Sequence, residues 1–370
     1  MKVLVTGGAG FIGSHTVDLL IEKGHEVRIL DSLEPPVHPH RRKPDYLTDE
    51  AEFIIGDVRN DNDLARALRG VDAVFHFAAY QGYLTDFSKF AFTNDGSTAL
   101  LFQIIVNEHL PIKKVVVASS QAVYGEGKYR CHSHGIRYPL PRSISQLEQG
   151  EWELKCPICR EIMEPLPTDE AVVHPHNQYA VSKYSQELYA LTLGKRFEIP
   201  TVVLRYSITR GPRQSFYNAY SGILRVFASR LHNNLIPTIY EDGKQLRDYV
   251  YVKDVAEANL LMIENDLVDY EAFNVGGNQV VTVMEYAKLL MSILGENVEL
   301  DCPNEFQYGD TRHIISDISK LGSLGWQPRM PLHRIIESYV DWVQQLGEVS
   351  DCHTEAREVM RHQQFLRSVR

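Results

Sequence analysis

The chain has 370 residues, a formal net charge of −10 at pH 7 and 44% hydrophobic residues. This length allows one large α/β domain and a smaller one, and it excludes a small disulfide-stapled scaffold. The acidic charge argues against a nucleic-acid partner, and no apolar run approaches the roughly 20 residues of a membrane span. The N-terminus carries no basic segment with a small-residue cleavage site, so we expect a cytoplasmic protein without a membrane partner.

The first predicted elements are a strand, a glycine turn and a helix. An apolar run at residues 2–6 breaks at Gly7, Gly10 and Gly13, and residues 14–23 then show helical apolar spacing. Glycines at this spacing allow a sharp turn, close approach of the backbone to a pyrophosphate, and tight packing of the helix on the strand. The pattern predicts a dinucleotide site, and a glycine turn that only packs is the alternative.

A second strand, residues 26–30, follows the helix and ends in Asp31. A carboxylate at this distance from the glycines is placed to bind the adenosine ribose. It would repel a 2′-phosphate, so NAD is favoured over NADP, while Arg41 and Arg42 leave NADP open.

Strands and helices then alternate along the chain. We expect strands at 52–55, 73–77 and 114–118, and helices at 63–68 and 94–108. This alternation predicts a parallel, doubly wound sheet. Ligands of such sheets bind outside the carboxyl ends of the strands.

Residues that follow the strand ends are therefore candidates for the cofactor site. Asp57 and Val58 follow one strand, and the carboxylate can accept a hydrogen bond from the adenine amino group. Ala78 and Ala79 follow the next strand, where small side chains leave room for a cofactor against the backbone.

Ser120, Tyr179 and Lys183 are the candidate catalytic residues. Ser120 ends the fifth strand, whereas Tyr179 and Lys183 lie one turn apart on a helix expected over 177–188. A free phenol has a pKa near 10, and a nearby ammonium can lower that by about 1–3 units. We therefore expect Lys183 and an oxidised nicotinamide to bring the pKa of Tyr179 toward neutral pH.

Together these motifs resemble the extended short-chain dehydrogenase/reductase family, specifically its nucleotide-sugar epimerases and dehydratases. The resemblance runs from Met1 to about Trp342. It implies that Tyr179 is the catalytic base, that Lys183 binds the nicotinamide ribose and tunes the tyrosine, and that Ser120 holds the sugar hydroxyl. The expected cofactor-binding residues are Gly7, Gly10, Phe11, Ile12, Gly13, Asp31, Asp57, Val58, Ala78, Ala79, Tyr179 and Lys183.

The resemblance also implies how the chain is divided. We expect an NAD-binding Rossmann domain over 1–204, a smaller α/β substrate domain over 205–346, and a tail over 347–370. Residues 248–266 are expected to return to the first domain, and residues 126–168 to form an insertion. The family further suggests a homodimer that pairs through the helices at 94–108 and 179–193.

The substrate domain is expected to bind a nucleoside-diphosphate sugar. Six arginines and a lysine lie between residues 205 and 247, against two acids, which favours a compact phosphorylated ligand over a solvated basic face. In the family, the residue that matches Arg247 binds the diphosphate. The expected substrate-binding residues are Gln121, Arg213, Asn218, Arg247, Asp310 and Arg312.

Three positions depart from the family pattern. Dehydratases carry Asp-Glu directly after the serine or threonine, because elimination of water needs an added acid and base. This chain has Gln121-Ala122 there, so elimination is not expected. Ile208 replaces a frequent asparagine and Gln307 a frequent arginine, and both changes bear on the identity of the sugar and its nucleotide.

The insertion at 126–168 contains Cys131-x-x-His134 and Cys156-x-x-Cys159. Both spacings allow two side chains to reach one tetrahedral zinc ion. We expect structural zinc on Cys131, His134, Cys156 and Cys159, with His132 as the alternative histidine. Reduced thiols or a redox pair are the other interpretations. Four protein ligands would leave no open position, so a catalytic zinc is not expected. The insertion, with residues 44–47 and 309–313, resembles the dTDP-L-rhamnose 4-epimerase group.

The sequence thus predicts an NAD-dependent epimerase that acts at C4 of a nucleoside-diphosphate sugar through a transient 4-keto intermediate. The enzyme alternative is a 4-ketosugar reductase or sugar-nucleotide dehydrogenase, which would consume its cofactor. A dinucleotide-sensing regulator is the non-enzyme alternative, but it would have no use for Ser120, Tyr179 and Lys183. A zinc-ribbon nucleic-acid module is disfavoured by the charge.

Overall fold

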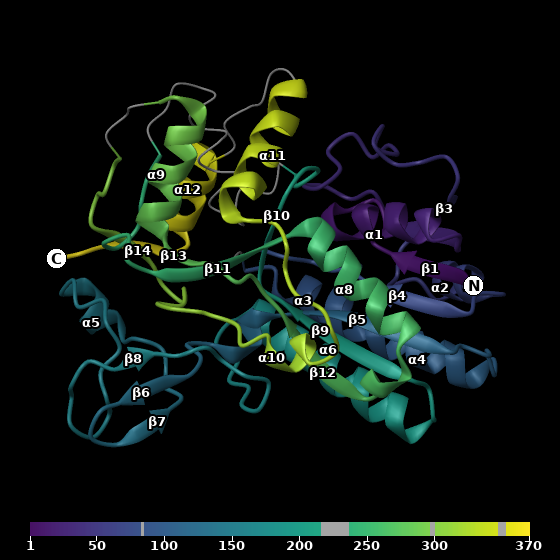
Figure 1. The fold of residues 1–370 in the computed structure, drawn as a ribbon, viewed down its shortest axis with the longest axis horizontal. Coiled ribbons are helices and arrows are strands. Elements are labelled where there is room, and N and C mark those ends of the chain that lie inside the picture. Colours follow the sequence, from purple (N-terminus) through teal and green to yellow (C-terminus); the bar gives the residue numbers. More distant parts are fainter. Residues whose placement is uncertain (83–84, 216–236, 297–299, 347–352) are drawn as a thin grey trace.

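The fold is built around a seven-stranded sheet whose paired strands are all parallel (Figure 1). The computed structural model describes residues 1–82, 85–215, 237–296, 300–346 and 353–370. The strand order is β12-β9-β5-β4-β1-β2-β3. The strands are β1 Lys2–Thr6, β2 Glu26–Asp31, β3 Glu52–Ile55, β4 Ala73–His76, β5 Lys114–Ser120, β9 Thr201–Tyr206 and β12 Glu271–Val275.

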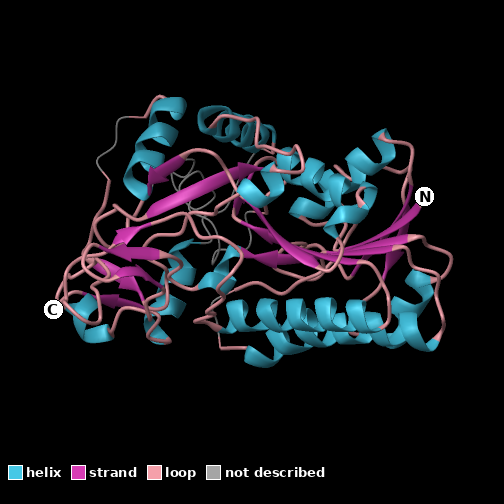
Figure 2. Ribbon diagram, turned by 60° about the horizontal axis from the view of Figure 1, so that its bottom comes forward, coloured by secondary structure: helices cyan, strands magenta, loops and turns pink. Residues whose placement is uncertain are grey.

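Helices cover both faces of this sheet (Figure 2). On β1, Val3 and Val5 face one core and Leu4 faces the other, as the twofold alternation of a strand requires. The first core lies under α1 Phe11–Glu22 and α8 Val252–Glu264, and the second lies under α2 Asp61–Leu68, α4 Ser97–Asn107 and α6 Gln178–Arg196. These results confirm the predicted doubly wound sheet.

The helix predicted at 94–108 begins earlier and is irregular. It consists of α3 Phe87–Phe90, the π-helical turn η1 Ala91–Gly96, and α4. Within the π turn, the Asn94 side chain accepts from Tyr80 N at 2.7 Å and donates to Ser182 Oγ at 2.9 Å. The turn therefore links the end of β4 to helix α6, which carries the candidate catalytic residues.

The smaller lobe contains a three-stranded sheet of β10 Ile208–Arg210, β11 Leu246–Tyr251 and β13 Val280–Thr282. It packs on α9 Val283–Leu294 and α11 Leu332–Gln345. The chain crosses between the lobes more than the division by residue number suggests: α8 packs on the large sheet as expected, and β12 also joins that sheet.

The insertion forms a small unit of its own, with the sheet β7-β6-β8 and one short helix (Figure 1). Its elements are β6 Tyr129–Cys131, β7 Gly135–Arg137, α5 Ile144–Glu148 and β8 Glu164–Pro165. The remaining short elements are η2 Gln121–Tyr124, η3 Asp266–Val268 and α10 Ser319–Gly322.

The tail is ordered over 353–370 and packs on the smaller lobe. It contains α12 His353–His362 and β15 Leu366–Ser368, and β15 pairs antiparallel with β14 Glu305–Gln307. Arg357 and Arg361 of α12 both pair with Glu305. Among the described helices, none has the length and apolar character that crossing a bilayer requires.

Candidate functional site

The glycine turn brings the N-terminus of α1 against the end of β4. Gly7 has a φ of +69°, and a Cβ there would lie 2.7 Å from Ala78 N. A Cβ on Gly13 would lie 2.8 Å from Gly8 Cα and closer still to Gly7 O. Neither position has room for a side chain. The N-cap residue Gly10 offers no side chain to the helix, so the first amides of α1 are available to an anion.

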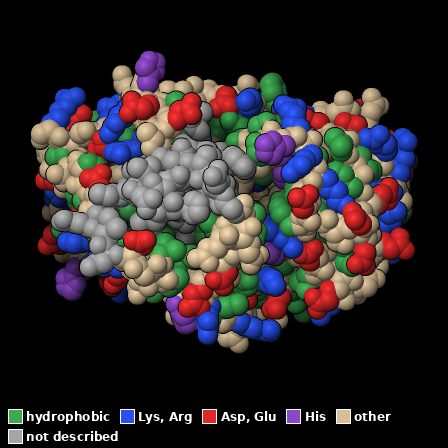
Figure 3. Space-filling model, turned by 90° about the horizontal axis from the view of Figure 1, so that it is seen from above, with side chains coloured by type: hydrophobic (Ala, Val, Ile, Leu, Met, Phe, Trp, Pro, Cys, Tyr) green, Lys and Arg blue, Asp and Glu red, His purple; other side chains and the backbone are tan. Residues whose placement is uncertain are grey.

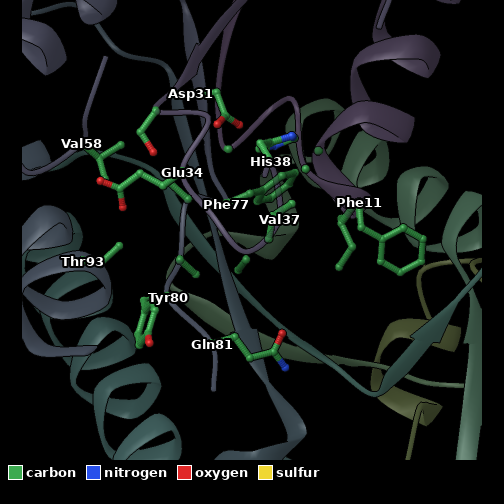
Figure 4. Close-up of a pocket in the computed structure, with 18 of the residues that line it drawn as sticks. Phe11, Asp31, Glu34, Val37, His38, Val58, Phe77, Tyr80, Gln81 and Thr93 are labelled. Atoms are coloured by element: carbon green, nitrogen blue, oxygen red, sulfur yellow. The ribbon is translucent and has the colours of Figure 1, made fainter. Parts of the chain in front are cut away.

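These residues line a cavity of about 340 Å³ at the carboxyl ends of the strands (Figure 4). That volume is typical of a small-molecule site. The cavity brings together all twelve predicted cofactor-binding residues, from Gly7 to Lys183.

Several other residues of the cavity are not indicated by the sequence motifs. The loop after Asp31 contributes Glu34, Val37 and His38, which Figure 4 shows on one side of the cavity. Tyr80, Gln81 and Thr93 lie on another side, and Gln214 and Ser215 come from the smaller lobe. The prolines in residues 35–39 indicate a loop that is neither helix nor inner strand. They do not indicate that this loop lines the cavity.

Asp31 and Asp57 occupy one end of the cavity. Asp31 accepts from Ala9 N at 3.0 Å and from Leu33 N at 2.9 Å. Burial raises the pKa of Asp31, and the two amides oppose that effect. Asp57 accepts from Arg59 Nε at 2.9 Å, and this contact holds the pKa of Asp57 below its usual value despite partial burial. Arg59 also pairs with Glu34 at 2.8 Å.

Tyr179 and Lys183 also line the cavity, and a hydrogen bond joins Tyr179 to Ser120 at the end of β5. Asn177 caps α6 by accepting from Ala180 N at 2.9 Å, which fixes the first turn of this helix. Lys183 Nζ donates to Ala118 O at 2.8 Å and to Gln186 Oε1 at 2.9 Å. Ser120 Oγ accepts from Ala122 N at 3.2 Å.

Burial controls the protonation of the two α6 residues in the absence of a ligand. It raises the pKa of Tyr179 to about 12, against the effect of a hydrogen bond with Ser120. It lowers the pKa of Lys183 to about 7, against the charge of Glu187. In the protein alone, desolvation of the phenolate dominates the pKa of Tyr179. The expected lowering of this pKa by Lys183 together with an oxidised nicotinamide stays a prediction for the NAD-loaded enzyme.

A buried ion pair connects α6 to the sheet behind the site. Glu187 binds Arg205 at 2.6 Å and also accepts a hydrogen bond from Ser119 Oγ. Arg205 donates further to Tyr124 Oη at 3.0 Å, which in turn donates to Asn274 Oδ1 at 2.6 Å. Arg205 is thus committed to the scaffold and is not free to bind a phosphate.

Three of the predicted substrate-binding residues lie together, because Arg247 contacts both Asp310 and the backbone of Arg312. Gln121 is buried and accepts from Ser316 Oγ at 3.3 Å. Arg247 pairs with Asp310 at 3.3 Å and donates to Thr311 O at 2.7 Å. Asn218 lies outside the described residues.

The side chains of two predicted substrate-binding residues are occupied by partners within the protein. The Arg213 guanidinium binds Asp18 at 2.7 Å and lies over the ring of Tyr46, while the cavity is lined by its neighbours. The Arg312 side chain is completely buried and is bound by the carboxylates of Glu153, Glu241 and Asp242. In both cases acidic partners distant in sequence occupy the guanidinium.

The four predicted metal ligands meet in the insertion. Their ligand atoms all lie within 4.8 Å of one another, and the group comprises Cys131, His134, Cys156 and Cys159. Cys131 Sγ lies 3.5 Å from both His134 Nδ1 and Cys159 Sγ. Ligand bonds of about 2.0–2.3 Å in a tetrahedral zinc site give ligand separations of this size. His134, not the alternative His132, completes the group.

Acidic and basic side chains are intermixed on the described surface that Figure 3 shows. The predicted cofactor-binding residues line the cavity described above.

Comparisons with known proteins agree with this architecture. The chain is 30% identical over 350 residues to dTDP-L-rhamnose 4-epimerase of Burkholderia thailandensis, which covers 93% of this chain and 95% of that protein. The crystal structure of UDP-glucose 4-epimerase with UDP-glucose from Thermotoga maritima is 30% identical, with a TM-score of 0.77, and covers 94% of this chain and 100% of that one. UDP-glucuronic acid 4-epimerase from Bacillus cereus in complex with NAD is 25% identical, with a TM-score of 0.75 and the same coverage.

The sequence model described as the NAD dependent epimerase/dehydratase family matches residues 3–142 and 160–276. That match includes the glycine turn, the strand ends and helix α6. The chain therefore belongs to the NAD dependent epimerase/dehydratase family and is an enzyme of that type.

Proposed function

We propose that the enzyme epimerises C4 of a nucleoside-diphosphate sugar with tightly bound NAD and a transient 4-keto intermediate. The observation that carries the proposal is that Tyr179 and Lys183 line the same cavity as the glycine turn, with Ser120 hydrogen-bonded to Tyr179. The relatives described above act on C4 by name, although they differ in sugar and nucleotide.

The residues of the cavity fit NAD. Gly7 and Gly13 leave a cradle that any side chain would fill, and the amides at the start of α1 can bind the pyrophosphate. Asp31 is placed to bind the adenosine ribose, and Lys183 the nicotinamide ribose. Bound there, NAD supplies the hydride acceptor and then the hydride donor.

The protein groups move one proton. Tyr179, as phenolate, removes the proton of the C4 hydroxyl while that carbon is oxidised to the ketone, and Ser120 donates a hydrogen bond to the same oxygen. The keto sugar then presents its opposite face, is reduced, and recovers the proton from Tyr179. The reaction has no net redox change, so no cofactor is consumed.

The high pKa of Tyr179 in the protein alone shows what bound NAD has to contribute. A positive charge within about 4–6 Å lowers a phenol pKa by about 1–3 units, and the oxidised nicotinamide supplies such a charge. This charge would bring the pKa of Tyr179 from about 12 to roughly 9–11, so bound NAD makes the phenolate easier to form than it is in the protein alone.

The substrate's diphosphate is assigned to Arg247. This guanidinium lies on β11, and its Nη1 and Nη2 atoms make four hydrogen bonds, two of them to Asp310 and Thr311. Its Nε–H is the one donor without a hydrogen-bond partner among the described residues, and it can donate to a phosphate oxygen. The absence of Asp-Glu after Ser120 favours epimerisation over dehydration.

The experiment is NMR analysis of products from a panel of dTDP-, UDP-, GDP- and CDP-sugars. The proposal requires an equilibrium mixture of C4 epimers without added NADH. A sustained absorbance change at 340 nm with a sugar nucleotide would instead establish the reductase or dehydrogenase.

The Cys131–Cys159 cluster is proposed to hold structural zinc. Three sulfurs and one imidazole at tetrahedral separations support this, and four protein ligands leave no position for a substrate. The ion would hold residues 126–168 in shape, since such sites contribute folding energy directly.

A homodimer is proposed through α3, η1 and α6. Their outer surface exposes Phe87, Phe92, Val181, Leu188 and Tyr189, an unusual number of large apolar side chains for a solvated helix pair. Light scattering tests this proposal: Leu188→Glu should yield monomers, and a wild-type protein that is already monomeric contradicts it.

A further inference from the structure

The insertion is joined to the smaller lobe by a group of charges that we call the clasp, in which Glu153 and Asp242 are partly exposed and the other members are buried. Its members come from three segments distant in sequence: residues 126–153 of the insertion, residues 241–242, and residue 312. The clasp consists of Glu126, Arg142, Glu153, Glu241, Asp242 and Arg312.

Arg312 is the centre of the clasp. Its guanidinium is fully buried and lies 2.5 Å from Glu153, 2.8 Å from Glu241 and 2.7 Å from Asp242. Glu153 also receives His313 Nε2 at 3.0 Å. One carboxylate of the insertion thus holds two consecutive residues of the smaller lobe.

The backbone of the same segment is held as well. Arg142 donates to Asp310 O at 3.0 Å, and Thr311 Oγ1 donates to Gly125 O at 3.1 Å. Arg312 N donates to Glu126 Oε2 at 2.8 Å. Residues 310–312 are therefore fixed one after another by the insertion and its base.

These three residues are the ones that bind the Arg247 guanidinium. Arg247 donates to Arg312 O at 2.9 Å and to Thr311 O at 2.7 Å, and it pairs with the Asp310 carboxylate at 3.3 Å. Among the described residues, every hydrogen-bond partner of this guanidinium apart from the carbonyl of Leu246 belongs to the segment that the insertion holds. The direction in which Arg247 points consequently depends on where the insertion sets residues 310–312.

The Cys/His cluster lies in the part of the insertion that supplies Glu153. Leu154, the next residue, packs with Cys131, Cys156 and Met163 in a small core. Tyr129 of the same core contacts the His313 ring, with centroids 6.4 Å apart. The clasp and the Cys/His cluster are therefore parts of one packed unit.

We propose that the insertion is a positioning element for substrate binding, in which Glu153 acts through Arg312 to orient Arg247 toward the diphosphate. This inference rests on the proposed function, which assigns the diphosphate to Arg247. Glu153 and Arg312 are positioning residues and do not touch the substrate.

The test measures binding of nucleoside diphosphates to the NAD-loaded enzyme by calorimetry, using whichever of dTDP, UDP, GDP and CDP the wild type binds most tightly. Glu153→Gln removes the charge at nearly constant volume. Glu151→Gln is the matched control, since Glu151 lies in the same loop but forms an exposed pair with Lys155. We expect Glu153→Gln to weaken binding roughly 10- to 100-fold, the range for a misaligned charge-assisted hydrogen bond. NAD content and the control should match the wild type.

A double-mutant cycle separates positioning from general destabilisation. If Glu153 acts through Arg247, then Glu153→Gln has little further effect on nucleotide binding in an Arg247→Gln background. Additive losses, or wild-type binding by Glu153→Gln alone, overturn the inference. Wild-type binding by Arg247→Gln, or no binding of any nucleotide by the wild type, overturns the proposed function instead. Glu153→Asp, which keeps the charge and shortens its reach, replaces Glu153→Gln if that variant does not fold, and the same outcomes decide.

Discussion

Gly13 offers the sharpest test of how the fold creates its cofactor site. An alanine there would place a methyl group 2.8 Å from Gly8 Cα, whereas ordinary contacts of a Cβ begin at 3.4 Å. The first turn of α1 must therefore move away from β1 by about 0.6 Å or more, and its amides move with it. Overpacking of this kind costs about 1–3 kcal/mol. If that cost falls on the bound state, NAD affinity drops roughly 5- to 150-fold.

Two further glycines make this a graded series. A Cβ on Gly10 would lie 3.2 Å from Gly7 O, a tight contact that a small shift relieves, so Gly10→Ala should lose less affinity. Gly322 in α10 has no atom within 4 Å of its Cβ position, and Gly322→Ala should bind NAD as the wild type does. The assay is titration of NAD into cofactor-stripped protein, with NAD content of the purified variants as a second readout. Equal affinity of Gly13→Ala and Gly322→Ala would refute the steric argument.

Three other predictions follow from the site and its surroundings. Tyr179→Phe should remove at least 100-fold of the turnover, since general base catalysis contributes about 10²–10⁴-fold, while NAD content stays normal; retained epimerisation would refute the assignment of the base. Asp248 is fully buried, and burial raises its pKa to about 7 against hydrogen bonds that include Gly277 N at 3.2 Å. Between about pH 4 and 7 the native state therefore holds a proton that the unfolded chain releases, so wild-type stability falls with rising pH relative to Asp248→Asn, by about 1.36 kcal/mol per pKa unit of difference. Urea unfolding at pH 5 and pH 8 measures this, and a constant difference between the two proteins would contradict it. Cys156→Ser should release zinc and make residues 126–168 sensitive to protease, with Cys302→Ser, outside the cluster, as the control. Wild-type protein without zinc would end the metal proposal.

The sequence predicts the features of this protein that depend on local pattern. The alternation of strands and helices, the glycine turn and the residues at the strand ends are all short-range signals, and the structure brings the twelve predicted cofactor residues around one cavity. The two short motifs Cys131-x-x-His134 and Cys156-x-x-Cys159 are also local signals. Each spacing suits two ligands of one zinc ion, which predicts that the four side chains come together, as they do in the structure.

Features that depend on distant partners could not be predicted. Arg312 is of the residue type that most often binds phosphate, but its guanidinium is bound by Glu153, which lies 159 positions earlier in the chain. Arg213 is likewise occupied by Asp18. The pKa of Tyr179 depends on burial, which no spacing of tyrosine and lysine reveals. The tail forms a strand, β15, that pairs with β14, and the polar composition of the tail does not indicate this pairing.

The path of the chain between the two lobes limits which segments of this enzyme can be exchanged with those of a relative. The cofactor lobe is discontinuous, because α8 and β12 return to the large sheet after β10 and β11 have begun the smaller lobe. A fragment that ends at residue 204 would lack the edge strand β12 and expose the apolar face that α8 covers. Exchanging the substrate lobe with that of a relative therefore requires several crossovers. The insertion behaves differently, since Leu166 N donates to Lys128 O at 2.9 Å and its two ends are therefore adjacent. It can be exchanged as one continuous segment, provided that its partners in the clasp, Glu241 and Arg312, are exchanged with it.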